Sequence, residues 1–163
     1  MRMIETLEER RLFACTIALD AYGTLNVTSD LTGDTIAVSE KLGTATVTVG
    51  GVSKGSFAGV KRVVVRGGGG TDTITFTGYS VGADIFGDDG IDTINLYDYR
   101  VGTTTGFSTA SGGVGADKIT SYAGEYAVLH GDGDNDTITV QGSKYIKVYG
   151  DAGTDAIYVN SGA

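Results

Sequence analysis

Hydrophobic and polar side chains alternate through much of the chain, most regularly after residue 60. Ile74 and Phe76 flank Thr75, and the same pattern returns in Ile94 and Leu96, Ile138 and Val140, and Ile157 and Val159. A two-residue period is typical of β-strands that bury one face. We therefore expect short strands along this region, each with its apolar side chains facing a common core.

Each of these segments follows a turn rich in glycine and aspartate. Five copies of the turn recur at spacings of 20, 25, 19 and 19 residues, and they begin at Gly67, Gly87, Gly112, Gly131 and Gly150. In every copy the sixth residue is aspartate and the eighth is isoleucine. A unit this short cannot bury its apolar face alone, so successive units are expected to stack with equivalent strands as parallel neighbours.

The predicted fold class is therefore all-β, a right-handed parallel β-solenoid with coils of about 20 residues and a short N-terminal capping helix. An antiparallel sandwich of hairpins would show the same alternation, but it does not need one turn sequence after every second strand. Three parts are expected: an N-terminal helix, cap or export segment at 1–21, degenerate β-coils at 22–66, and repeat coils at 67–163.

Composition and charge exclude several classes of protein. The 163 residues include 27 glycines and no proline, which is a poor composition for helices. No apolar run reaches the roughly 18 residues that a membrane span needs. The formal net charge is −8, and residues 67–163 carry 13 acidic against 4 basic side chains. Such a field repels phosphate backbones, so we expect no nucleic-acid partner, and it attracts cations.

Stacked coils would bring the aspartates of the repeated turn into one column. Like charges in a column repel one another, so a compensating cation is expected there. Ca²⁺ fits because it takes about six to eight oxygen ligands in mixed geometry, whereas Mg²⁺ demands a tight octahedron. The alternative is that Asp and Thr side chains cap the turns by hydrogen bonding, with no metal.

The five copies resemble the RTX repeat, Gly-Gly-x-Gly-x-Asp-x-hydrophobic-x, which forms calcium-binding parallel β-rolls in secreted bacterial proteins. The resemblance covers residues 67–159. The motif occurs here once per coil instead of every nine residues, so ions are expected along one edge. The resemblance implies calcium ligands at the sixth position, joined by backbone oxygens and neighbouring carboxylates. The candidate metal-site residues are Gly67, Gly69, Asp72, Gly87, Asp88, Asp89, Asp92, Gly112, Asp117, Gly131, Asp132, Asp134, Asp136, Gly150, Asp151 and Asp155.

The N-terminal segment around Leu7 and Leu12 is similar to a short leading segment of some bacterial secreted repeat proteins. Its glutamates precede its arginines, an order that favours a short helix. Together with the RTX resemblance, this implies a secreted protein of the cell surface.

No enzyme activity is expected. The single histidine, His130, occupies an outward position before a turn, and Cys15 has no evident base. We expect a calcium-binding structural protein whose subunits join head to tail into filaments, because an uncapped solenoid end exposes strand edges. The alternatives are a monomeric adhesin or carbohydrate-binding module with a cell-surface polysaccharide as partner, and a polysaccharide-acting β-helix enzyme.

Overall fold

The computed structural model describes residues 15–30, 32–100 and 106–160, and all regular elements in these segments are β-strands. The all-β prediction is confirmed, and no helix in the described residues is available to cross a membrane. The predicted capping helix would fall within residues 1–14, outside the described residues. The strands are β1 (Thr16–Leu19), β2 (Thr24–Thr28), β3 (Thr35–Lys41), β4 (Thr44–Val49), β5 (Val52–Ala58), β6 (Arg62–Gly69), β7 (Thr73–Gly78), β8 (Ala83–Asp89), β9 (Thr93–Asp98), β10 (Ser108–Val114), β11 (Lys118–Asp132), β12 (Thr137–Tyr149) and β13 (Ala156–Asn160).

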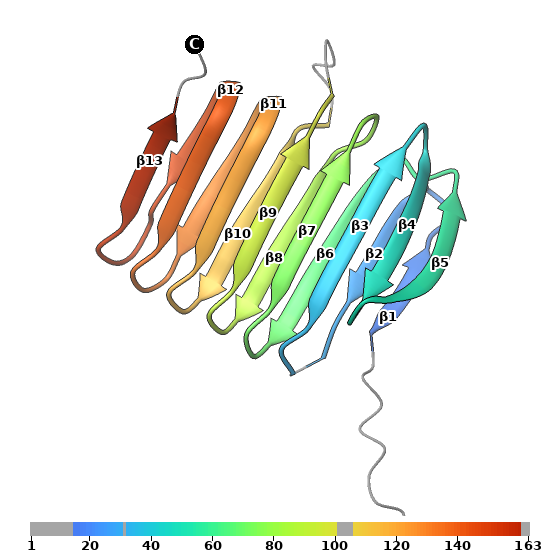
Figure 1. The fold of residues 1–163 in the computed structure, drawn as a ribbon, viewed down its shortest axis with the longest axis horizontal. Coiled ribbons are helices and arrows are strands. Elements are labelled where there is room, and N and C mark those ends of the chain that lie inside the picture. Colours follow the sequence, from blue (N-terminus) through green and yellow to red (C-terminus); the bar gives the residue numbers. More distant parts are fainter. Residues whose placement is uncertain (1–14, 31, 101–105, 161–163) are drawn as a thin grey trace, which may run out of the picture.

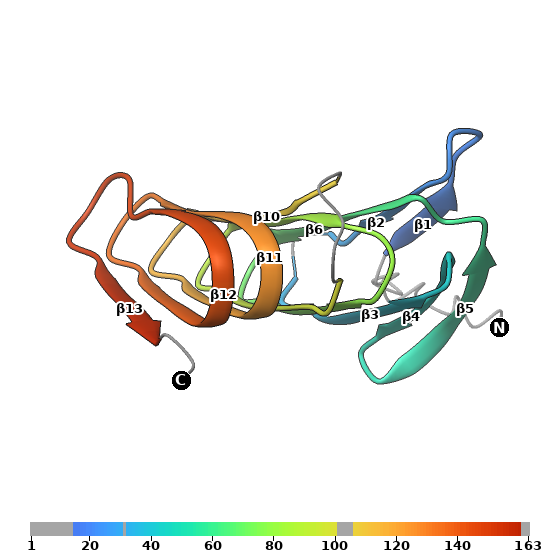
Figure 2. The same cartoon turned by 90° about the horizontal axis from the view of Figure 1, so that it is seen from above.

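The strands form two mostly parallel layers stacked as a solenoid-like ladder (Figures 1 and 2). One layer contains β2, β6, β8, β10 and the later parts of β11 and β12. The other contains β3, β7, β9, the earlier parts of β11 and β12, and β13. The long strands β11 and β12 bend from one layer into the other, so each closes almost a full coil (Figure 2).

Equivalent side chains stack in register through the core. Ile36 pairs with Ile74, and this position continues through Ile94, Ile119, Ile138 and Ile157. The first five of these isoleucines are fully buried, whereas Ile157 in β13 is 45 % exposed. Each isoleucine is thus covered by its neighbours in adjacent coils, which is why one repeat has no core of its own.

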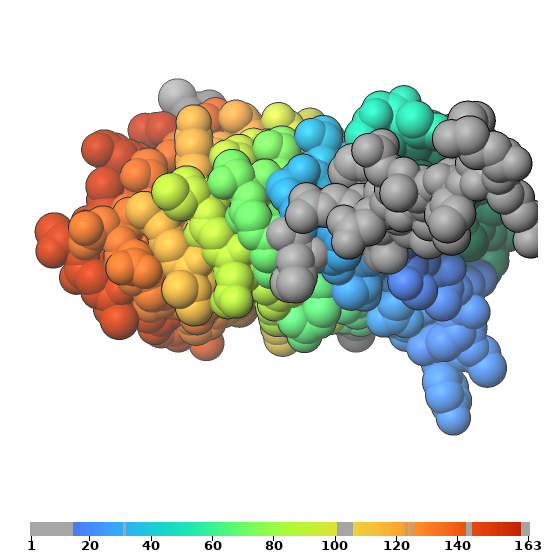
Figure 3. All heavy atoms as spheres, turned by 90° about the horizontal axis from the view of Figure 1, so that it is seen from below, coloured from blue at the N-terminus to red at the C-terminus, as the bar shows by residue number. Residues whose placement is uncertain are grey.

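The N-terminal end of the ladder departs from the predicted coils. Within 22–66, the segment from β2 to β3 makes one coil, but β3, β4 and β5 pair as an antiparallel meander, and β1 pairs antiparallel with β2. Gly50 and Gly51 both have positive φ and make a tight turn between β4 and β5. A turn this short can join only antiparallel strands. The β1–β2 hairpin projects from the elongated body, along which the later coils follow in sequence order (Figure 3).

The edge opposite the Gly/Asp turns is held by buried charged groups. Glu40 is fully buried, and its carboxylate accepts hydrogen bonds from the Ser80 hydroxyl and from the backbone N–H groups of Gly43 at 2.8 Å and Val81 at 3.1 Å. Further along, Asp98 accepts from Arg100 at 2.6 Å and from Ser108 at 2.8 Å. These carboxylates are well supplied with donors, as buried polar groups generally are.

Candidate metal centre

The repeated turns bring six aspartates into a single column, buried except at Asp155, which is half-buried. We call Asp34, Asp72, Asp92, Asp117, Asp136 and Asp155 the inner aspartate column. In each step, one carboxylate oxygen (Oδ1) accepts the backbone N–H of the aspartate in the preceding coil, at distances from 2.5 to 3.0 Å. The predicted alignment of the five sixth-position aspartates is thus present in the fold. The hydrogen bonds also show that these side chains cap the adjacent turn, as the metal-free alternative proposed.

In four of the six aspartates the second carboxylate oxygen has no such partner, whereas Oδ2 of Asp34 accepts from the Ser29 hydroxyl. The Oδ2 atoms of Asp72, Asp92, Asp117 and Asp136 are buried and accept no hydrogen bond from the described residues. These four aspartates are at most 2 % exposed. A buried carboxylate oxygen without a donor loses the free energy of its hydration and regains nothing. Four such atoms in a row therefore require an explanation beyond turn capping.

The first glycine of a turn has no side chain, which allows the aspartate carboxylate to lie close to its backbone. A Cβ atom added to Gly67 would lie 2.5 Å from Oδ2 of Asp72 and 2.6 Å from the carbonyl oxygen of Gly87 in the next coil. The same crowding by a carboxylate and a carbonyl oxygen is found at Gly87, Gly112 and Gly131. Beside each of these four glycines lie two kinds of oxygen donor, a carboxylate oxygen from its own turn and a carbonyl oxygen from the next coil.

Burial raises the pKa of four column carboxyls, those of Asp72, Asp92, Asp117 and Asp136, above the ordinary value of 3.8. The pKa reaches about 6 for Asp72 and about 7 for Asp117, and it is also raised for Asp92 and Asp136. In each case burial is the largest cause, the hydrogen bond from the preceding amide acts against it, and neighbouring carboxylates add repulsion. Ionisation of the column near neutral pH is consequently unfavourable unless positive charge is supplied.

Glu40 shows what a satisfied buried carboxylate looks like in the same molecule. Burial acts to raise its pKa, but hydrogen bonds from Ser80, Gly43 and Val81 outweigh it, so the pKa of Glu40 is lowered. The carboxylates of Asp72, Asp92, Asp117 and Asp136 each receive one amide donor, and their pKa values move in the opposite direction. The contrast distinguishes Glu40, a buried carboxylate with enough hydrogen-bond donors, from the inner aspartates, which still lack a partner for one oxygen.

A second series of contacts lies on the outer side of the same turns. The side chain just before a turn contacts the second residue of the next turn: Arg66 with Asp88 at 2.9 Å, the Ser111 hydroxyl with Asp132, and His130 Nδ1 with Asp151 at 2.8 Å. We call these the outer turn pairs. The turn that begins at Gly112 has a glycine, Gly113, as its second residue. The outward residue in the coil before it is Phe86, whose ring centroid lies 4.1 Å from the Arg66 guanidinium.

The predicted site residues therefore fall into separate groups. The sixth-position aspartates and the first glycines come together inside the turns. Asp88, Asp132 and Asp151 are engaged in the outer turn pairs instead, and Asp89 and Asp134 are exposed to solvent. Gly69 is buried in β6. The fold thus separates the inner aspartates from the carboxylates on the outer side of the same turns.

Sequence reasoning missed two participants. Asp34 begins the inner column, and the shortened turn Thr32–Ile36 could have revealed it, because Ile36 stands two residues after Asp34 as in the full copies. His130 belongs to an outer turn pair with a residue 21 positions away. No local pattern marks that contact, since it depends on the register of adjacent coils.

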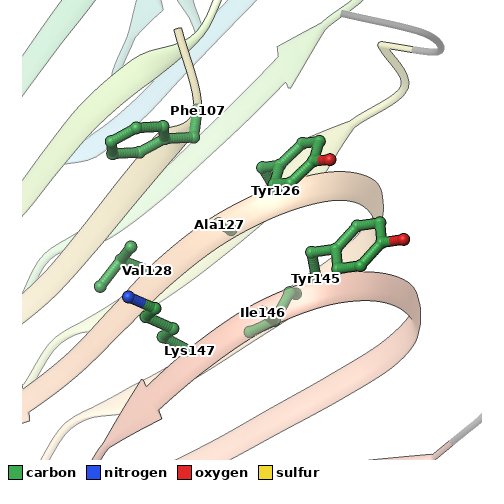
Figure 4. Close-up of a pocket in the computed structure, with 7 residues that line it drawn as sticks. All are labelled: Phe107, Tyr126, Ala127, Val128, Tyr145, Ile146 and Lys147. Atoms are coloured by element: carbon green, nitrogen blue, oxygen red, sulfur yellow. The ribbon is translucent and has the colours of Figure 1, made fainter. Parts of the chain in front are cut away.

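An aromatic pocket of about 530 Å³ lies on the outer face of the layer that contains β10, β11 and β12. Tyr126 and Tyr145 project beside it from the neighbouring strands β11 and β12, and Phe107 from the residue just before β10 (Figure 4). Val128 and Lys147 complete much of its lining. The Tyr126 and Tyr145 rings are stacked with centroids 4.9 Å apart. Their mutual contact holds a flat aromatic surface in place.

No family model, curated protein or solved structure matches this chain.

Proposed function

We propose that the protein is a secreted, calcium-stabilised structural β-solenoid of the cell surface or extracellular matrix, with right-handed coils as in nearly all parallel crossovers. The observation that carries this proposal is the set of four buried, unpartnered Oδ2 atoms in the inner aspartate column. Secretion rests on the resemblance to RTX repeats, and no enzyme activity is part of the proposal.

The choice of aspartate argues for a cation. If the column only capped turns, asparagine would accept the same N–H through Oδ1 and would also donate to a nearby carbonyl oxygen. Aspartate stands at all six positions, although at four of them its second oxygen accepts no hydrogen bond from the described residues. A divalent cation would offset the repulsion between the carboxylates and would supply the contact that each second oxygen lacks. Oδ2 of Asp72 with the Gly87 carbonyl oxygen, and the equivalent pairs in later coils, would supply ligands.

Calcium suits these donors better than magnesium. All the available ligands are hard carboxylate or carbonyl oxygens, and Ca²⁺ accepts irregular sets of them. A site with few protein ligands is weak, with dissociation constants of roughly 10⁻⁴ to 10⁻³ M in extracellular modules. Occupancy would then depend on the high calcium concentration outside cells, which agrees with a secreted location.

Thermal unfolding tests this proposal. At pH 8, adding CaCl₂ to metal-free protein is expected to raise the melting temperature by about 5–10 °C, because ligand at 100 times its dissociation constant stabilises by about 2.7 kcal/mol. MgCl₂ at equal ionic strength is expected to give a much smaller rise. The Asp92→Asn and Asp117→Asn double variant should lose most of the calcium response. Exposed Asp89→Asn is the matched control and should retain it.

An unchanged melting temperature across the calcium titration would reject the proposal. Equal responses of the double variant and the Asp89→Asn control would also reject the inner column as the site, because the response would then reflect general screening of the acidic surface.

End-to-end contact between copies is the assembly that we propose for this solenoid. Within the described residues, β13 pairs only with β12, and Ile157 and Val159 are 45 % and 67 % exposed. An apolar strand with a free edge favours pairing with another strand. At the other end the antiparallel β1 and β5 are the outermost strands. The contact would thus join unlike surfaces and could propagate.

A lysine in β13 tests the assembly. Val159→Lys is expected to convert a concentration-dependent assembly, measured by light scattering and negative-stain microscopy in millimolar CaCl₂, into single particles. Val114→Lys is the control, because Val114 is similarly exposed at 61 % but lies at the turn edge. Monodisperse single particles of the unmodified protein would contradict end-to-end assembly.

The aromatic pocket supports a second candidate function, the binding of a surface polysaccharide. Sugar rings pack against exposed aromatic side chains, which present an apolar body and a polar edge. Phe107, Tyr145 and the Lys147 amine offer both kinds of contact beside one opening. Retardation in polysaccharide-containing gels, lost in Tyr145→Ala but kept in Tyr22→Ala, would support this function. Equal mobility of all three proteins with and without polysaccharide would exclude it for the sugars tested.

A further inference from the structure

We propose that His130, Asp132 and Asp151 form a binding site for a divalent transition-metal ion, with Zn²⁺ as the best fit. The site lies outside the inner aspartate column and uses different residues. One ligand atom from each of the three side chains lies within 4.8 Å of the other two. No other group of this kind, with three or more potential ligands, occurs in the described residues.

The backbone fixes the three ligands on adjacent turns. His130 is the outward residue just before the turn that contains Asp132, and the parallel register places His130 beside Tyr149 in the next coil. Asp151 then occupies in that coil the position that Asp132 holds in its own. Both aspartates have positive φ, 71° for Asp132 and 65° for Asp151. This unusual backbone conformation recurs because the turn is repeated.

Neighbouring side chains restrict the ligands further. The Ser111 hydroxyl donates to Oδ2 of Asp132, and the Tyr149 ring stacks on His130 with centroids 4.7 Å apart. Metal-binding carboxylates and imidazoles are commonly oriented by such outer contacts. His130 Nδ1 already lies 2.8 Å from Oδ2 of Asp151. Zn–N and Zn–O bonds of about 2.0–2.1 Å place tetrahedral ligands roughly 3.3 Å apart. Small rotations of half-exposed side chains would therefore close the site.

The donor set selects the kind of metal. One imidazole nitrogen with two carboxylate oxygens suits Zn²⁺ and related ions, whereas Ca²⁺ prefers oxygen ligands alone. The corresponding outward residues before the other full turns are Arg66, Phe86, Ser111 and Tyr149. The imidazole is therefore what distinguishes this turn from the others. The competing explanation is that His130 and Asp151 form a plain hydrogen-bonded pair.

Zinc titration of the full chain in saturating CaCl₂ tests the proposal, with Cys15→Ser as the background because a thiol also binds zinc. His130 is the only histidine, so its ring-proton NMR signals report on one residue. Zn²⁺ is expected to shift these signals and saturate at one ion per chain, and Co²⁺ to give a visible absorption band. His130→Asn and Asp151→Asn should each weaken binding by roughly tenfold or more, and Ser111→Ala by about tenfold. Asp89→Asn is the control that should bind normally.

Ring signals that do not move with Zn²⁺, or equal zinc affinity in His130→Asn and the control, would overturn the site in favour of the plain pair. This outcome is independent of the calcium proposal. Loss of the calcium-dependent melting shift would leave zinc binding at His130 unaffected, and the reverse also holds.

Discussion

Replacing Gly90 with alanine is expected to abolish stable folding of the coils around it. Gly90 has a φ of +144°, and a Cβ atom there would lie well inside 3.0 Å of the Gly70 carbonyl oxygen in the preceding coil. A backbone carbonyl cannot swing away as a flexible side chain can, and neighbouring coils are held by parallel pairing on both sides. We expect a loss of several kcal/mol, since close packing leaves no space to relax. Urea unfolding followed by circular dichroism would measure it.

Gly51→Ala provides the matched control. Gly51 also has positive φ, at +76°, but a Cβ atom there would meet nothing within 4 Å. Its cost is expected to be about 1 kcal/mol, which is the usual penalty of a side chain in this backbone region. If the two variants were equally stable, the close approach of successive turns would not govern the stability of this fold.

Metal-free protein is expected to lose stability as the pH rises from about 4 to about 7. Four of the inner aspartates have raised pKa values, about 6 for Asp72 and about 7 for Asp117 against an ordinary 3.8. Between those values the folded state binds more protons than the unfolded state, so the free energy of unfolding falls with rising pH. One pKa unit corresponds to about 1.4 kcal/mol. Because several carboxyls contribute, we expect a fall in melting temperature on the order of 10 °C.

Melting curves with a chelator at half-unit pH steps would measure this fall. Asp117→Asn removes one titrating group while it keeps the acceptor for the Asp92 N–H, so its curve should be flatter and its stability at pH 8 higher. Asp89→Asn, at an exposed position, should follow the unmodified protein. Calcium should restore stability mainly above pH 7, where the column is ionised. A stability that rises steadily from pH 4 to pH 8 without metal would contradict the raised pKa values.

The local pattern was sufficient to predict the repeated part of the fold. The alternation around Ile74 and Ile94 has period two, and the turns recur at nearly constant spacing, so the strands and their in-register stacking follow from neighbouring residues in the sequence. The alignment of Asp72, Asp92 and Asp117 was predictable for the same reason, because residues at equal positions in stacked units must lie above one another.

Pairings between distant segments were not predictable in this way. Strands β3 and β4 show the same alternation as a coil. The tight turns at Leu42 and Gly43 and at Gly50 and Gly51 send the chain back antiparallel. The sequence likewise placed the sixth-position aspartates and the second-position aspartates together along one edge, as ligands of ions between adjacent turns. In the fold, the carboxylate of Asp72 turns inward to an amide of the preceding coil, while that of Asp88 meets Arg66 outside.

The sequence alone thus determined the β-strands, their repeat and the column of aspartates, because these depend on spacing within about 20 residues. The tertiary structure decided which carboxylate oxygens are left without donors, and it brought His130 to Asp151. Both depend on how one coil meets the next, where a hydrogen bond joins residues about 20 positions apart and burial sets the charge that each group can carry.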